Sequence, residues 1–158
     1  MYLKGLETQK RYCENQRSDF LFVEPLKDNL WCWHFTIRGP KDSEFEGGLY
    51  HGYLDLPSTY PFNPFQVYFL NENGRFAINR KICFDATSDP NGWTPAWTVH
   101  SFVEALSTRF LIKEVGTSEG GHLITPPAHR MELARKSREW SCDHCGPLEE
   151  LEKKRWKD

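Results

Sequence analysis

Residues 30–38, LWCWHFTIR, alternate between two kinds of side chain along an extended chain. Large apolar side chains stand at every second position from Trp31 to Ile37. The positions between them carry Cys32, His34 and Thr36. A strand with one buried face has this period of two, so the stretch predicts a β-strand whose tryptophan face packs into a core.

Similar stretches lie on both sides of this strand. Residues 20–23 are a short apolar run before Pro25, and residues 49–56 and 65–70 are two further strand candidates. The sequence Gly-Pro-Lys-Asp-Ser at residues 39–43 has turn chemistry. Because the connections are short, successive strands are predicted to pair as an antiparallel meander.

Helical patterns lie at the two ends of the chain and after the strands. Residues 1–18 predict a moderately amphipathic helix. Thr98 can cap a second helix, whose apolar side chains follow a helical stripe over residues 99–110. A third helix is expected from about 127 to 140, after Thr-Pro-Pro, and residues 148–158 form a charged tail for which a frayed amphipathic helix is the expected element. Together these elements predict an α+β fold.

The composition is typical of one soluble globular domain. A chain of 158 residues can bury its own core, and none of its apolar runs approaches the ~20 residues of a membrane-spanning helix. The net charge of −2 argues against nucleic acid as the main partner. Five cysteines without an apolar signal segment predict a reduced protein that faces the cytosol.

Cys83 lies in an irregular stretch, residues 71–96, that has neither a helical nor a strand period. A cysteine is most often a small buried hydrophobe. Here Ile82 and Phe84 can anchor the loop while the thiol faces outward, and such a thiol can carry an acyl group as a thioester. A cysteine hydrolase is the alternative, which is disfavoured because no histidine lies in a protease-like local signature.

Asn73 lies ten positions before Cys83 and is the candidate for a second catalytic role. When an amine attacks a thioester, negative charge develops on the carbonyl oxygen, and a side-chain amide can donate a hydrogen bond to it. Loss of such a donor can raise the activation barrier by about 2.7–4 kcal/mol. Asn73-Gly74 is also a common turn dipeptide, so a structural role in its own loop is compatible with the catalytic one.

Cys142 and Cys145, with His144 between them, suggest a zinc site. A structural zinc ion needs four well-placed ligands, and no second pair can be recognised in the sequence. We therefore predict no metal here and interpret the two cysteines as the end of the preceding helix.

The order and spacing of several short motifs make residues 25–146 resemble the ubiquitin-conjugating enzymes, in particular their tail-anchored branch of the endoplasmic reticulum (ER). The motifs are WHFTIRGP at 33–40, FEGG at 45–48, YHG at 50–52, NGRF at 73–76, KIC at 81–83, WTPAW at 93–97, ARKS at 134–137 and CDHCG at 142–146.

The resemblance implies the ubiquitin-conjugating fold, with a four-stranded antiparallel meander sheet and about four helices. It places a catalytic core at residues 1–146, followed by a charged tail at 147–158. Cys83 is then the nucleophile that accepts ubiquitin as a thioester and, with a ligase, passes it to a lysine or hydroxyl of a substrate protein. The partners implied are ubiquitin, the activating enzyme, RING-type ligases and substrates. No cofactor is implied, since ATP is used by the activating enzyme.

The resemblance also assigns further site residues. Ligases are expected to contact the first helix together with Phe62, Pro95 and Ala96. An acidic gate residue near the cysteine has no clear equivalent, and residues 118–123 offer Glu119 and His122 in its place. The usual His-Pro-Asn triplet corresponds here to Asn-Glu-Asn, in which only Asn73 is retained.

In the full-length protein the resemblance implies a C-terminal anchor that holds the enzyme at the cytosolic face of the ER membrane. The present chain ends before any such anchor and is expected to be soluble. Two rival functions stay open. One is a ubiquitin-binding adaptor of the same fold; such adaptors lose the cysteine, so the presence of Cys83 beside Ile82 weighs against this function. The other is a carrier of a different ubiquitin-like modifier.

Overall fold

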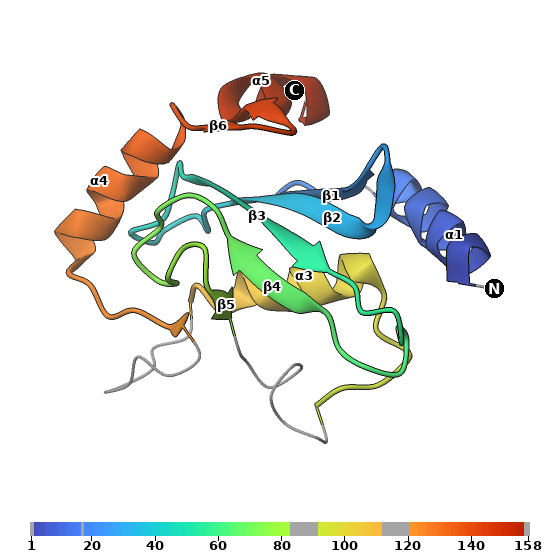
Figure 1. The fold of residues 1–158 in the computed structure, drawn as a ribbon. Coiled ribbons are helices and arrows are strands. Elements are labelled where there is room, and N and C mark those ends of the chain that lie inside the picture. The colour runs from blue at the N-terminus through green and yellow to red at the C-terminus, as the bar shows by residue number, and fades with distance from the viewer. Residues whose placement is uncertain (1, 17, 83–91, 112–120, 157–158) are drawn as a thin grey trace.

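A five-stranded antiparallel sheet forms the centre of the computed structural model, which describes residues 2–16, 18–82, 92–111 and 121–156 (Figure 1). The strands follow one another across the sheet in chain order, as predicted for a meander. They are β1 (Leu21–Leu26), β2 (Asn29–Arg38), β3 (Leu49–Asp55), β4 (Gln66–Phe69) and β5 (Lys81–Ile82). The helices of the described part are α1 (Tyr2–Asn15), α3 (Val99–Thr108), α4 (Pro127–Ser137) and α5 (Leu148–Arg155).

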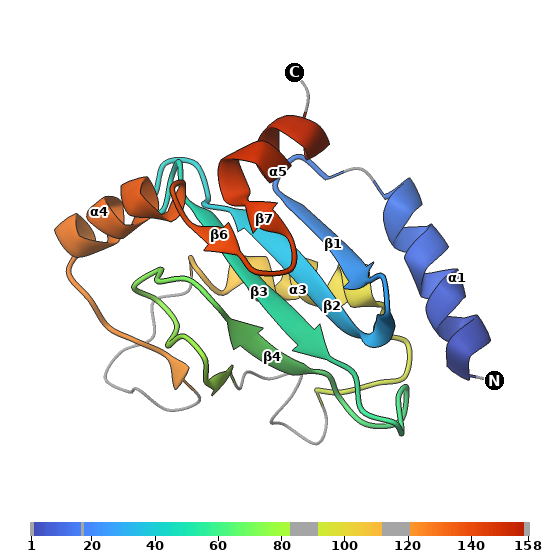
Figure 2. The same ribbon diagram turned by 45° about the horizontal axis from the view of Figure 1, so that its top comes forward.

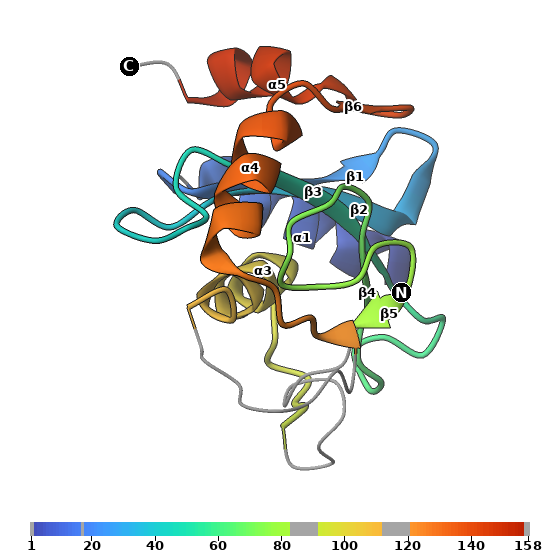
Figure 3. The same ribbon diagram turned by 90° about the vertical axis from the view of Figure 1, so that its left-hand side faces the viewer.

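The inner face of the sheet carries the core. Trp33, Phe35 and Ile37 of β2 are fully buried, as their alternation predicted. Opposite them in register on β3 lie Leu54 and Tyr50, which are also fully buried. Helix α3 covers this face (Figures 1 and 3). Burying these large apolar side chains together is the main force that holds strands and helix in place.

Helix α3 begins where its cap was predicted. The Thr98 hydroxyl accepts the backbone N–H of Ser101 at 2.9 Å, and the Ser101 hydroxyl accepts that of Thr98 at 3.0 Å. This reciprocal capping satisfies two amide groups that the first turn leaves without helical partners. The helix turns Phe102 and Leu106 into the core.

The C-terminal part of the chain differs from the expectation in the segment that holds the two cysteines. Helix α4 ends at Ser137 and is followed by a small hairpin of β6 (Ser141–Cys142) and β7 (Gly146–Pro147), so Cys142 and Cys145 do not end a helix. At the end of the helix the Ser137 hydroxyl accepts the backbone N–H of Leu49 at 2.9 Å, which ties the helix end to β3.

Helix α5 then packs on the outer face of the sheet, opposite to α3 (Figures 2 and 3). Leu148 and Leu151 are buried against Leu49. At its end the Trp156 indole donates to the carbonyl of Ser18 at 2.8 Å, and Arg155 pairs with Glu24. The segment after residue 146 is thus a packed helix that holds the first strand.

Candidate active site

Strand β5 brings the chain to the position of Cys83. Ile82 is fully buried and lies opposite Val67 of β4, and Lys81 lies opposite Tyr68. The anchoring role that the sequence suggested for Ile82 agrees with this burial. Cys83 is the next residue in the chain and lies outside the described residues.

Asn73 is fully buried and its amide bonds to its own loop. The side-chain oxygen accepts the backbone N–H groups of Arg75 at 2.9 Å and Phe76 at 2.7 Å. The side-chain nitrogen donates to the carbonyl of Asn71 at 3.2 Å. These three bonds fix the path of the loop that runs toward β5, as a turn-forming asparagine would.

Asn71 is a residue that sequence reasoning missed. Its side-chain oxygen accepts the backbone N–H of His51 at 2.8 Å, and its nitrogen donates to the carbonyl of Leu49 at 2.9 Å. The amide thus pairs with β3 as a strand backbone would, just beyond the end of β4. The only signal in the sequence was its place in the Asn-Glu-Asn triplet.

His122 lies beside the Asn73 loop. Its neighbours Gly121 and Leu123 pair with that loop, since the N–H of Ala77 donates to the Gly121 carbonyl at 2.7 Å and the N–H of Leu123 donates to the carbonyl of Arg75 at 2.8 Å. The His122 ring is buried and lies 5.3 Å from the ring of Phe76. Glu119, the other gate candidate, is outside the described residues.

Gly121 allows this segment to approach β5. Its φ of +84° favours glycine, and a Cβ there would come within 2.7 Å of the Ile82 side chain. The segment before Leu123 therefore lies directly against the last residue before Cys83. The structure thus brings the loop of Asn73, the segment of His122 and the end of β5 together.

The residues expected to contact ligases lie on two loops that are joined to each other. Phe62 is 68% exposed, and Pro95 and Ala96 are exposed as well. The Trp93 indole donates to the carbonyl of Pro61 at 3.1 Å, which holds the two loops together. The loop between β3 and β4 lies at the same end of the molecule as the N-terminal end of α1 (Figure 2).

Two other described thiols are poorly suited to nucleophilic chemistry. Burial raises the pKa of Cys13 to about 12. Burial, with a smaller contribution from Asp55, raises the pKa of Cys32 to about 11. Both thiols therefore stay protonated at neutral pH, where the thiolate is the reactive form.

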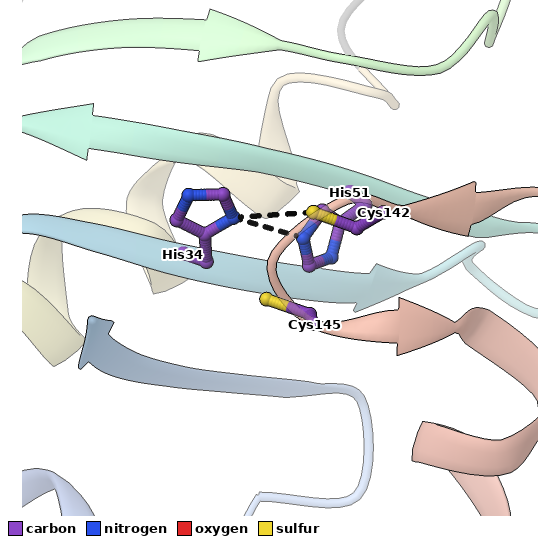
Figure 4. A group of neighbouring side chains, drawn as sticks. All are labelled: His34, His51, Cys142 and Cys145. Atoms are coloured by element: carbon purple, nitrogen blue, oxygen red, sulfur yellow. Dashed lines mark hydrogen bonds between the residues drawn. The ribbon is translucent and has the colours of Figure 1, made fainter. Parts of the chain in front are cut away.

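A group of four histidine and cysteine side chains, of the types that can bind a metal ion, lies on the outer face of the sheet, under the β6–β7 hairpin. His34 and His51 stand on β2 and β3, and Cys142 and Cys145 come from the hairpin (Figure 4). No second pair of ligands beside the two cysteines could be recognised in the sequence, and the structure supplies one. His144, which the sequence had grouped with the cysteines, is not among the four.

The family model described as "Ubiquitin-conjugating enzyme" matches residues 6–119. The chain is a ubiquitin-conjugating enzyme family member. The predicted family is thereby confirmed.

Named relatives of this ubiquitin-conjugating enzyme extend the match. Ubiquitin-conjugating enzyme E2 J1 of Homo sapiens is 40% identical over 130 residues, which cover 82% of this chain and 40% of that protein. Ubiquitin-conjugating enzyme E2 32 of Arabidopsis thaliana is 42% identical over 138 residues, covering 85% and 43%. The chain thus spans less than half the length of these two relatives.

The fold is confirmed by a solved structure, that of human ubiquitin-conjugating enzyme E2 G1. It has a TM-score of 0.63 and 23% sequence identity, over 70% of this chain and 94% of that one. The α+β fold with its antiparallel meander is as predicted, and β5 adds a short fifth strand to the expected four. Among the helices in the described ranges, none has the length and apolar character needed to cross a bilayer.

Proposed function

We propose that this chain accepts ubiquitin as a thioester on Cys83 and, together with a ligase, transfers it to a lysine or hydroxyl group of a substrate protein. The observation that carries the proposal is the family match over residues 6–119, which includes Cys83 directly after the anchored Ile82. The partners are then ubiquitin, its activating enzyme, a RING-type ligase and the substrate.

The chemistry is two successive acyl transfers. The Cys83 thiolate attacks the thioester carbonyl between ubiquitin and the activating enzyme, and the thiolate of that enzyme leaves. An acceptor amine or hydroxyl next attacks the new thioester, loses its proton, and displaces the Cys83 thiolate. Splitting one acyl transfer into two steps in this way is the general advantage of a covalent nucleophile.

Asn73 is proposed to support this chemistry by holding its loop beside β5. Its buried amide and three hydrogen bonds support that role. Donation to the oxyanion is the second role we propose for the same side chain, and an experiment that separates the two roles opens the Discussion. His122 is a weaker candidate for a gate residue, supported by its place beside the loop of Asn73.

The ligase is proposed to bind Phe62, Pro95 and Ala96. Their exposure supports the proposal, because an exposed aromatic residue beside apolar neighbours is typical of an interface anchor. The Trp93 bond to Pro61 presents the two loops as one surface.

We further propose that the full-length protein works in protein quality control at the cytosolic face of the ER. The resemblance to the tail-anchored branch supports this, and so does identity to proteins named E2 J1 and E2 J2. Membrane fractionation of the full-length protein tests the location. Recovery in the cytosolic fraction alone would contradict it.

A charging assay tests the central proposal. The chain is incubated with activating enzyme, ATP and ubiquitin and is then run on non-reducing gels beside Cys83→Ala. We expect one thiol-sensitive ubiquitin adduct that is absent in Cys83→Ala and retained in the matched control Cys32→Ala. Cys83→Ser should give an adduct that resists thiols, because an oxygen ester replaces the thioester.

The outcomes separate the rival functions. A folded chain that forms no adduct with ubiquitin but does so with another modifier has a different cargo. A chain that binds ubiquitin but is charged with no modifier is an adaptor. For the acceptor, discharge of the loaded chain to free lysine is compared with discharge to free serine, and lysine-only discharge would exclude the hydroxyl reaction.

A further inference from the structure

Four donor groups that the acyl-transfer chemistry does not use meet on the outer face of the sheet. They are the imidazoles of His34 and His51 and the thiols of Cys142 and Cys145. One ligand atom from each lies within 4.8 Å of all the others. Figure 4 shows the His34 ring directed at both His51 and Cys142.

Two of the separations between these ligand atoms match those of a tetrahedral zinc site. Bond lengths of about 2.0–2.1 Å to nitrogen and 2.3 Å to sulfur place two nitrogen ligands about 3.3 Å apart, and a nitrogen and a sulfur ligand about 3.6 Å apart. Here His34 Nδ1 lies 3.2 Å from His51 Nε2, and Cys142 Sγ lies 3.6 Å from His34 Nδ1. Two histidines and two cysteines are also a common ligand set of structural zinc sites.

A second layer of contacts orients the His51 ring. Its Nδ1 lies 2.8 Å from the Thr36 hydroxyl oxygen, on the side of the ring away from His34. When Nδ1–H donates to that oxygen, Nε2 keeps its lone pair and points into the cluster. Metal-binding histidines are typically held by such an outer hydrogen bond.

The hairpin presents both thiols from a short turn. Cys142 pairs with Gly146, whose φ of +91° favours glycine, and the tight return brings Cys145 back toward the sheet. A cavity of about 460 Å³ lined by His34, Cys142 and His144 opens beside the cluster and provides an entry path for an ion.

We propose that His34, His51, Cys142 and Cys145 together bind one zinc ion, which fastens the β6–β7 hairpin to β2 and β3. Four protein ligands close the coordination sphere, so the role is structural. The protons still held by the two thiols leave to solvent on binding, and the two thiolates balance the charge of the ion. The proposal replaces the prediction from sequence that the cysteine pair holds no metal.

The test begins with metal analysis of the 158-residue chain, purified in reducing buffer after growth with zinc. We expect about one zinc ion per chain, and we expect Cys145→Ser and the double variant Cys142→Ser/Cys145→Ser to lose it. Two matched controls line the same cavity without being among the four ligands. Cys32→Ser and His144→Ala should keep the ion.

Cobalt substitution gives a readout that does not depend on the variants folding. The chain loaded with Co²⁺ should show the visible bands of tetrahedral cobalt and a thiolate charge-transfer band in the near ultraviolet, and added Zn²⁺ should abolish both. Thr36→Val removes only the outer hydrogen bond to His51, so zinc affinity should fall by about 10–100-fold while the fold persists.

Three results would each overturn the proposal. The first is a reduced, folded chain that contains no zinc and shows no cobalt bands after incubation with the ions, which leaves a hydrogen-bonded cluster. The second is zinc content in Cys145→Ser equal to that of the parent. The third is a Cys142–Cys145 disulfide, seen as a mass two hydrogens lower in the chain isolated under reducing conditions.

Discussion

Asn73 can be changed so that its structural and catalytic roles separate. In Asn73→Ala the buried N–H groups of Arg75 and Phe76 both lose their acceptor. Leaving a buried donor without a partner costs about 1–3 kcal/mol, so the loss of two predicts roughly 2–6 kcal/mol of unfolding free energy. That is a large part of the total unfolding free energy of a domain, which is typically about 5–15 kcal/mol.

In Asn73→Asp the carboxylate still accepts from both N–H groups, but the donation to the Asn71 carbonyl is lost and an acceptor oxygen faces that carbonyl in its place. The two remaining bonds become charge-assisted, whereas burying the charge of this fully buried side chain costs stability. We therefore expect Asn73→Asp to be less stable than the parent but to keep both acceptor bonds that hold the loop.

Urea unfolding followed by tryptophan fluorescence measures both variants, in the same excess of chelator so that metal content does not differ. Glu72→Ala is the matched control, because Glu72 lies in the same loop and is exposed. The unfolding free energy of Glu72→Ala should stay within about 0.5 kcal/mol of the parent value. Destabilisation of Asn73→Ala no larger than that of Glu72→Ala would show that the Asn73 amide does not brace the loop.

The same two variants then report on catalysis. Asn73→Asp should still be charged with ubiquitin, since the loop is retained, but its side chain no longer donates a hydrogen bond. If Asn73 donates to the oxyanion, the rate of discharge to lysine should fall about 10²–10³-fold, the loss expected when one oxyanion donor is removed. A discharge rate close to that of the parent would assign Asn73 to the loop alone.

Three further predictions concern other parts of the molecule. Burial raises the pKa of Cys13 from 9.0 to about 12, so above pH 9 the folded chain keeps a proton that the unfolded chain releases. The contribution of the protonated thiol to the unfolding free energy is therefore full below pH 9 and is lost as the pH rises toward 12. Between pH 7 and pH 10 the parent should lose on the order of 1 kcal/mol of unfolding free energy that Cys13→Ala does not lose. Parallel pH profiles for the two proteins would contradict this. Phe62→Ala should leave the unfolding midpoint unchanged but reduce ligase-stimulated discharge. The control Leu111→Ala, at another exposed apolar residue, should change neither the midpoint nor the discharge. Equal ligase stimulation of Phe62→Ala and the parent would exclude Phe62 from the interface. Ser137→Ala leaves the N–H of Leu49 without its acceptor and should cost about 1–3 kcal/mol in urea unfolding, and a cost near zero would show that the bond is dispensable.

The sheet and the core helix could be predicted because their signals are local. The alternation in residues 30–38 assigned Trp33 to the core and His34 to the opposite face, and the structure agrees. Thr98 marked the start of α3 by its type and position. Such signals need only the period of the chain and the chemistry of a cap.

The outer face could not be predicted in the same way. His34 and Cys142 are 108 positions apart, and nothing in either local sequence indicates that they meet. The loop of Asn73 has no period, and the amide of Asn71 acts as a strand backbone only because β4 ends where it does. The position of Cys83 was predicted from its motif and stays a prediction, because that residue is outside the described ranges.

The contact of the last helix with the segment before the first strand has a consequence for biosynthesis. Ser18 and Trp156, which bond to each other, are separated by 138 positions. A ribosome that adds 5–20 residues per second needs about 7–28 s to cover that distance. During this interval the nascent strand pair β1–β2 has no cover on its outer face. We therefore expect chaperones that shield newly made chains to act on this face before the C-terminal helix emerges.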